Sequence, residues 1–310
     1  MSGGEKYRLV TRSDFDGLVC AVLLRQLGLI AEIKFVHPKD MQDGLIAVGA
    51  NDITTNLPYV EGVHLAFDHH LSETVRVGPR DNHVIDADAP SAARVVYDYY
   101  GGAVHFPAAW DKMIEEVDRA DSARYSLDDI LSPAGWSLLN YVMDSRTGLG
   151  RFRDFRISNH QLMMELIEYC RNHTIGEILS LPDVKERLDL YFAHEDLSKE
   201  QLMRCSTVRG NAVVVDLRDE DPIYACNRFM IYALHPECNI SIHALWGLNR
   251  QNTVFAIGHS ILDRSSKTNV GELCLSHGGG GHRQAGTCQV DTGRAETVLA
   301  ELVDRINADG

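Results

Sequence analysis

The stretch VHLAFDHH, residues Val63–His70, is an apolar run that ends in one acid and two imidazoles. The apolar residues predict a short buried strand, and three adjacent metal-capable side chains, Asp68, His69 and His70, stand where it ends. Carboxylate oxygen and imidazole nitrogen together favour a hard divalent cation such as Mn²⁺ or Mg²⁺. The stretch therefore predicts a strand that ends at a metal site, provided that other segments deliver further ligands.

Several upstream segments have the same layout of an apolar strand followed by polar side chains. Asp14 and Asp16 follow a predicted strand at Tyr7–Val10, and Asp52 follows a predicted strand at Leu45–Val48. These strands alternate with helical segments, which indicates a mostly parallel α/β sheet. Ligands bind at the carboxyl ends of strands in such sheets, so one pocket is expected to collect these acids.

The rest of the chain predicts a helical middle and a second, smaller α/β domain. A helix over Ala108–Val117 ends in a further acidic pair, Asp118 and Asp121. The periodicity then predicts helices until the strands of the second domain begin near Ala212. We expect an N-terminal catalytic, metal-binding domain at 1–125, a helical connector at 126–205 and a C-terminal substrate-binding domain at 206–310.

Composition limits the functions that the chain can have. Its formal net charge of -14 argues against a surface for long duplex nucleic acid, because such surfaces neutralise phosphates with many Lys and Arg side chains. Seven scattered cysteines without a C-x-x-C pair favour a reducing compartment. The N-terminus lacks the features of a signal peptide, and no apolar stretch is long enough for a membrane span. We expect a cytoplasmic protein without a membrane partner.

A glycine run near the C-terminus, Gly278–Gly281, precedes His282 and Arg283. Glycine lets backbone N–H groups approach an anion closely, so the run favours phosphate binding over the alternative of a flexible linker. Arg264, in a polar stretch, is a further candidate phosphate contact, with a solvated loop as its alternative.

Three motifs, in this order, resemble those of the DHH phosphoesterase superfamily: Ser13–Gly17, Asp68–His70, and Gly279–His282 with Ala285. The superfamily includes RecJ-type exonucleases, nanoRNase and pAp phosphatases, cyclic-dinucleotide phosphodiesterases and exopolyphosphatase-like proteins. The resemblance implies a DHH catalytic domain and a DHHA1-type substrate domain. It also implies one or two Mn²⁺ or Mg²⁺ ions as cofactor.

Carried over residue by residue, the resemblance assigns three sets of site residues. Asp68, His69 and His70 would be catalytic. The metal ligands would be Asp14, Asp16, Asp52, Asp68, His69 and Asp118, with Asp121 as the alternative to Asp118. The substrate would be bound by Arg12, His70, Arg264, Gly279, Gly280, Gly281 and His282.

Arg12 departs from the family motif H-x-D-x-D-G, in which His stands two residues before the first Asp. A guanidinium stays protonated and offers no lone pair, so it cannot replace His as a metal ligand. Arg12 is expected to meet a substrate phosphate instead.

Together these features predict metal-dependent hydrolysis of phosphoester or phosphoanhydride bonds by a metal-activated water in an interdomain cleft. The expected substrate is small or short-chained, either polyphosphate or a short oligonucleotide, so the enzyme would be exopolyphosphatase-like or an oligonucleotide phosphodiesterase. The alternative is a non-catalytic or weakly catalytic regulatory protein that binds phosphate or nucleotide, because Arg12 replaces the motif His. The sequence is also compatible with a homodimer.

Overall fold

The computed structural model describes residues 6–310, which divide into two compact units. Unit 1 contains residues 6–124, 134–145 and 150–188, and unit 2 contains residues 125–133, 146–149 and 189–310. The helical stretch 126–205 is shared between the two units, and the boundary falls within helix α10 (Pro182–Ala193). None of the helices within residues 6–310 has the length and apolar character needed to cross a membrane.

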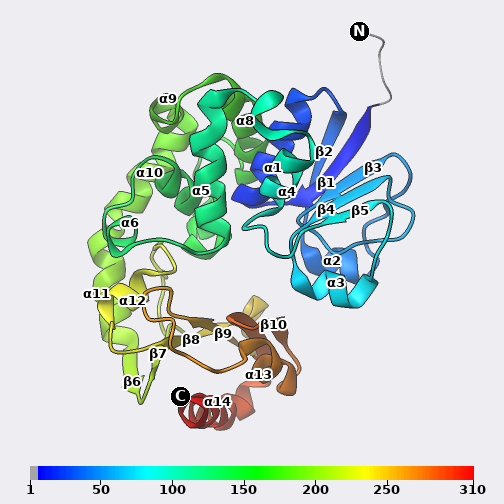
Figure 1. The fold of residues 1–310 in the computed structure, drawn as a ribbon. Coiled ribbons are helices and arrows are strands. Elements are labelled where there is room, and N and C mark those ends of the chain that lie inside the picture. Colours follow the sequence, from blue (N-terminus) through cyan, green and yellow to red (C-terminus); the bar gives the residue numbers. More distant parts are fainter. Residues whose placement is uncertain (1–5) are drawn as a thin grey trace. The chain divides into compact units, whose positions relative to one another are not determined.

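Unit 1 is built on a five-stranded sheet in which all neighbouring strands are parallel, in the order β2-β1-β3-β4-β5 (Figure 1). The predicted parallel α/β architecture is therefore confirmed. Because the strands are parallel, their carboxyl ends lie along one edge, where such sheets bind ligands. The strands are β1 (Tyr7–Arg12), β2 (Ile30–Val36), β3 (Asp52–Thr55), β4 (Leu65–Asp68) and β5 (His83–Ile85).

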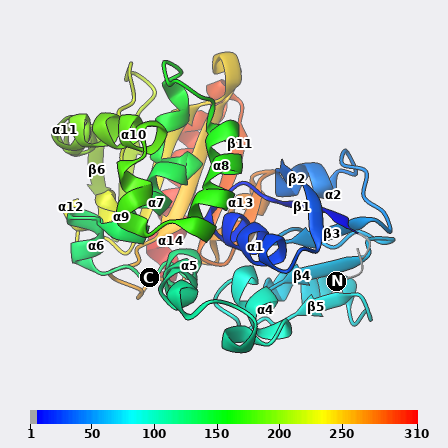
Figure 2. The same ribbon diagram turned by 90° about the horizontal axis from the view of Figure 1, so that it is seen from above.

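Helices cover both faces of this sheet, as Figure 2 shows from above. Helix α1 is almost entirely buried between the sheet and neighbouring helices, since residues from Phe15 to Leu24 are all buried. On the other face, Met41 of α2 packs against Val10 and Val36 of the sheet. The helices of unit 1 are α1 (Phe15–Gln26), α2 (Pro38–Gln42), α3 (Leu71–Val77), α4 (Ala92–Tyr99), α5 (Asp111–Asp121), α7 (Gly135–Met143), α8 (Asn159–Asn172) and α9 (Ile175–Ser180).

The predicted strand at Leu45–Val48 is wrong. Ile46 and Val48 pack against a hydrophobic cluster as part of an irregular segment, without joining the sheet. The third strand is instead β3, which begins at Asp52. Both of its threonines, Thr54 and Thr55, are fully buried, and Thr55 Oγ1 donates a hydrogen bond to Thr11 Oγ1 at 2.7 Å, which satisfies the hydroxyl group of Thr55.

Unit 2 contains a six-stranded sheet in the order β10-β11-β9-β8-β7-β6, in which only β7 and β8 pair in parallel. One hydrophobic core joins this sheet to α13 and α14. The strands are β6 (Ser206–Arg209), β7 (Ala212–Asp216), β8 (Ile240–Trp246), β9 (Thr253–His259), β10 (Gly280–His282) and β11 (Ala285–Val290). The helices are α6 (Leu127–Leu131), α11 (Glu195–Cys205), α12 (Met230–Leu234), α13 (Val270–Ser276) and α14 (Ala295–Asp309).

Candidate metal centre

The turn between β1 and α1 places two carboxylates at the carboxyl edge of the parallel sheet. Asp14 caps α1, and its Oδ1 accepts a hydrogen bond from the backbone N–H of Gly17 at 2.9 Å. The turn is tight enough to require glycine, because a Cβ on Gly17 would lie 2.0 Å from the carbonyl oxygen of Arg12. The next carboxylate, Asp16, is directed inward and is only 2% exposed.

Asp16 is held in place by the first turn of α4. Its Oδ2 accepts a hydrogen bond from the backbone N–H of Ala92 at 3.0 Å, and its Oδ1 accepts one from Ala93 at 2.7 Å. These N–H groups have no partner within the helix itself, so a carboxylate at this position satisfies them and interacts favourably with the helix dipole. The orientation of Asp16 is therefore fixed by backbone atoms.

The three residues after β4 have different environments. Asp68 is fully buried, with Oδ1 2.6 Å from His70 Nδ1, whereas its Oδ2 has no hydrogen-bond partner within residues 6–310. His69 Nδ1 lies 3.2 Å from the carbonyl oxygen of Ala89. Because a carbonyl only accepts, His69 Nδ1 is the donor, and the Nε2 of the neutral ring keeps its lone pair. Metal-binding histidines are commonly oriented in this way.

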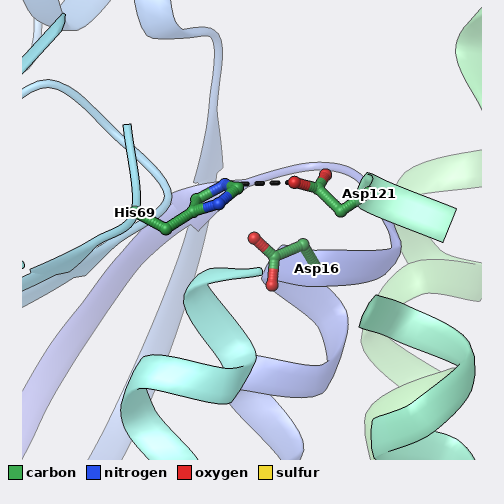
Figure 3. Close-up of side chains that lie close together, drawn as sticks. All are labelled: Asp16, His69 and Asp121. Carbon is green, nitrogen blue, oxygen red and sulfur yellow. Dashed lines mark ion pairs between the residues drawn. The ribbon is translucent and has the colours of Figure 1, made fainter. Parts of the chain in front are cut away.

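Asp16, His69 and Asp121 converge from three separate segments (Figure 3). Each offers one ligand atom, and these atoms lie within 4.8 Å of one another. His69 Nε2 is 3.0 Å from Asp121 Oδ2. Although this is an ion-pair distance, Nε2 is not aligned for a hydrogen bond to any group of the described chain. The two groups thus have the arrangement expected of ligands aimed at a common point.

The pKa values of this cluster reflect an excess of negative charge. Burial raises the pKa of Asp16, and the charge of Asp121 contributes to bringing it to about 7. Burial lowers the pKa of His69, but its contact with Asp121 and the charge of Asp16 outweigh this effect and raise the pKa to about 9. A cation among the three groups would neutralise this charge.

The donor set fits a divalent cation. Two carboxylate oxygens and one imidazole nitrogen suit Mn²⁺ or Mg²⁺, whereas Cys20, whose Sγ lies 4.0 Å from Asp16 Oδ1, has a thiol whose pKa is raised by burial. A buried carboxylate oxygen without a hydrogen bond, Asp68 Oδ2, lies next in the chain to His69 and adds a further acceptor. Asp16, His69 and Asp121 are thus the residues that would hold the ion.

The residue after β3 is Asn56, which the sequence interpretation missed. Its amide Nδ2 lies 3.3 Å from Asp14 Oδ1 and 3.4 Å from Oδ2. Arg12 Nε lies 2.9 Å from Asp14 Oδ2. Arg12, Asp14 and Asn56, which we call the arginine subsite, are therefore joined at the carboxyl ends of β1 and β3. The β-branched run before Asn56 was the available signal for this strand.

Asp52, expected among the metal ligands, lies at the opposite end of its strand. It is the first residue of β3, and Arg8 at the start of β1 donates to both of its oxygens, at 2.7 and 2.9 Å. Asp52 Oδ2 also accepts a hydrogen bond from the backbone N–H of Gly49 at 2.7 Å. The assignment of Asp52 to the metal site is therefore corrected, because the parallel strands carry it to the amino edge of the sheet.

Asp118, the first choice for the acid after the helix, is also placed elsewhere. Its Oδ1 accepts a hydrogen bond from Ser91 Oγ at 2.7 Å, and its Oδ2 accepts two from Arg94, at 3.0 and 2.6 Å. Both oxygens are thus used in a buried ion pair that ties α5 to α4. The structure brings the alternative, Asp121, to His69 instead.

Replacing Asp118 by Asn is expected to lower the free energy of unfolding by about 2 kcal/mol, because Arg94 loses a buried charged partner. The affinity for Mn²⁺ is expected to stay within about threefold of the unmodified protein, since Asp118 does not join the metal cluster. Urea denaturation and titration calorimetry measure the two quantities. A loss of Mn²⁺ affinity without a loss of stability would contradict this placement.

The glycine run of unit 2 forms part of a β-hairpin. Gly279 and Gly281 pack tightly against β11, since added Cβ atoms would lie 2.1 Å from the carbonyl oxygen of Thr287 and 2.3 Å from that of Ala285. Gly280 has open space beside it, and His282 is exposed. Arg264 is exposed on the segment between β9 and α13. Gly279 and Gly281 therefore have a packing role, whatever ligand the hairpin binds.

Comparisons with known proteins identify relatives of this chain. No protein-family model matches it, and no curated protein matches it. A solved structure of PggH, a pGpG-specific phosphodiesterase from Vibrio cholerae, is 58% identical, covers 98% of this chain and 100% of its own, and has a TM-score of 0.86.

Two more distant structures share the fold at a TM-score of 0.50. RecJ from Thermus thermophilus, solved in complex with Mn²⁺, is 14% identical over 97% of this chain and 52% of its own. CDC45 from Entamoeba histolytica is 9% identical over 97% of this chain and 95% of its own. The full-length match at 58% identity shows that the chain belongs to the same family as the Vibrio cholerae phosphodiesterase, within the DHH phosphoesterase superfamily whose motifs the sequence carries.

Proposed function

We propose that this enzyme hydrolyses the phosphodiester bond of pGpG, or of a closely similar linear dinucleotide, with the help of a divalent cation. The observation that carries the proposal is the 58% identity, over nearly the whole of both chains, to a phosphodiesterase specific for pGpG. The acidic surface agrees with a short substrate, because a net charge of -14 disfavours long nucleic acid. Among the substrates expected from the sequence, a short oligonucleotide is thus favoured over polyphosphate.

In this proposal the residues of unit 1 hold and orient the cation. Asp16 is fixed by two backbone N–H groups of α4, His69 by the carbonyl oxygen of Ala89, and Asp121 by its place at the end of α5. A bound Mn²⁺ or Mg²⁺ would supply an activated water and offset the charge of the phosphate. Such preorganised ligands keep their geometry during the reaction, which lowers the cost of stabilising its transition state.

His70 has a different proposed role, in binding the substrate. Its Nδ1 is fixed by the buried carboxylate of Asp68, at 2.6 Å, so the ring has one orientation. A quarter of the side chain is exposed, and an imidazole can bind a phosphate oxygen or donate a proton to a leaving oxygen. Asp68 therefore acts on the substrate through His70, in addition to the acceptor that its Oδ2 provides.

We propose that unit 2 supplies further contacts to the substrate. A Cβ on Gly280 would meet open space, and His282 and Arg283 follow it in the hairpin. Open backbone and positive side chains at one hairpin suit a phosphate or a nucleotide. Arg264 is the other proposed contact. We also infer a cytoplasmic location, because all seven cysteines are free thiols, as in a reducing compartment.

The test is to incubate the purified full chain with pGpG and Mn²⁺ and to separate the products by anion-exchange chromatography. Addition of water to the bridging phosphorus with cleavage of its bond to the 3′ oxygen, which takes up a proton, converts pGpG into two molecules of GMP. The matched substrates are pApA, pAp, cyclic diguanylate and polyphosphate. Preferred release of phosphate from polyphosphate, or binding of pGpG without any hydrolysis, would overturn the proposal.

A further inference from the structure

The arginine subsite stands where the family resemblance leads one to expect ligands for a second metal ion. Arg12 occupies the position of the motif His, and Asn56, rather than a carboxylate, occupies the carboxyl end of β3. Asn56 is only 2% exposed and has a φ of 53°, an uncommon conformation for a residue other than glycine. The fold thus turns its amide towards Asp14, with both Oδ atoms of Asp14 within 3.4 Å of Nδ2.

The single carboxylate of this subsite already has hydrogen-bond and charge partners. Asp14 Oδ1 accepts from the backbone N–H of Gly17, and its Oδ2 lies 2.9 Å from Arg12 Nε. One carboxylate and one guanidinium sum to no net charge, and the remaining acceptor, Asn56 Oδ1, is neutral. A dication would have to displace or face the guanidinium, which repels it at short range. The arginine subsite is therefore unsuited to hold a cation.

The neighbouring cluster has the opposite character. Asp16 and Asp121 offer two carboxylate oxygens, and His69 offers an imidazole nitrogen. Within the described part of the chain, this is the group of three potential ligands whose atoms come within 4.8 Å of one another, and Asp14 is not a member of it. One subsite thus attracts a dication, whereas the other carries its own fixed positive charge.

We propose that the enzyme works with one divalent cation, held by Asp16, His69 and Asp121, and that the guanidinium of Arg12 takes the electrostatic place of a second cation. This inference rests on the proposed phosphodiesterase function. The Arg12 side chain is 37% exposed, so its guanidinium is accessible to a phosphate oxygen while Asp14 holds it. A guanidinium binds phosphate strongly through directed N–H groups, and unlike a metal ion it cannot be lost to a chelator.

The first experiment counts metal ions without any substrate. After equilibration with Mn²⁺ and removal of the free ion, the unmodified protein is expected to retain about one Mn²⁺ per chain and to show the electron paramagnetic resonance spectrum of an isolated ion. The double variant Arg12→His, Asn56→Asp restores an imidazole and a carboxylate, and it is expected to bind about two ions with an exchange-coupled spectrum. Two ions, or a coupled spectrum, in the unmodified protein would overturn the inference, and so would retention of none.

The second experiment compares two arginines of the same strand. Arg12→Gln is expected to raise KM for pGpG by about 10- to 100-fold, because a charged contact to phosphate is lost, while the retained Mn²⁺ stays at about one ion. Arg8→Gln removes the same charge from the other end of β1 and is the matched control, with KM expected to remain within about twofold. An unchanged KM in Arg12→Gln would contradict the role of Arg12.

The two experiments separate this inference from the proposed function. If pGpG is not hydrolysed but one isolated Mn²⁺ is bound, the proposed substrate is wrong and the one-ion site stands. If pGpG is hydrolysed and two ions are bound, the proposed function stands and the role of Arg12 as a replacement for a cation is wrong.

Discussion

Replacing Asp121 by Asn is expected to lower kcat/KM for pGpG by about a thousandfold. The change keeps the shape of the side chain but removes one of the two carboxylates that face His69. The cation then binds more weakly and polarises the phosphate less, and a loss of several kcal/mol of transition-state stabilisation corresponds to a rate loss of this size. Steady-state kinetics at saturating Mn²⁺, together with Mn²⁺ titration calorimetry, measure both effects.

The control for this prediction lies on the same helix. Glu115→Gln removes one negative charge from an exposed position of α5, where the side chain is 63% exposed, and is expected to leave kcat/KM within about twofold. Asp121 lies at the last residue of α5, so neither variant is expected to change the melting temperature much. Activity of Asp121→Asn within about threefold of the unmodified enzyme would remove Asp121 from the metal site.

The choice between Asp118 and Asp121 marks a limit of the sequence interpretation. Residues three apart on a helix share a face, so the helical pattern alone could not tell which of them faces His69. The decision depends on Arg94, from the neighbouring helix α4, which takes both oxygens of Asp118 into a buried pair. The sequence predicted that one acid at the end of this helix would join the site, but the tertiary partner decided which one.

Asp52 and Asn56 show why one strand was predicted at the wrong place. The apolar residues Ile46 and Val48 form a pattern that is typical of a strand, yet they are partly buried in an irregular segment outside the sheet. The true strand contains two threonines, which look polar in sequence but are fully buried, and the hydroxyl group of Thr55 is paired inside the sheet. The predicted strand ended before Asp52, whereas the true strand begins at Asp52 and ends before Asn56. The residue at the carboxyl end of the strand is therefore Asn56 and not Asp52.

The remaining elements of unit 1 followed from strong local signals. The helix after Asp14 has a capping acid and a nearly continuous apolar sequence, and the strand before Asp68 is apolar throughout. Parallel connections then bring the residues after β1 and β4 to one edge, as the strand alternation implied. Convergence of Asp16 and His69 could therefore be expected from sequence, whereas the pairing of Arg12 with Asp14 is visible only in the structure.

Removal of the divalent cation is the last expected result, and it affects both activity and stability. With a chelator present, hydrolysis of pGpG is expected to fall below about 1% of its rate and to return on addition of Mn²⁺.

Free Mn²⁺ at about 100 times its Kd should also add about 2.7 kcal/mol of stability, because the ion binds only the folded state, and it should raise the melting temperature of unit 1 by several degrees. The physical source is the excess negative charge that raises the pKa of His69 to about 9 and that the ion neutralises. Differential scanning calorimetry with and without Mn²⁺ measures the shift. Asp121→Asn is the control, since it is expected to lose most of the shift while keeping the melting temperature of the metal-free protein. If the chelator changes neither the activity nor the melting temperature, the cluster of Asp16, His69 and Asp121 has a purely structural role.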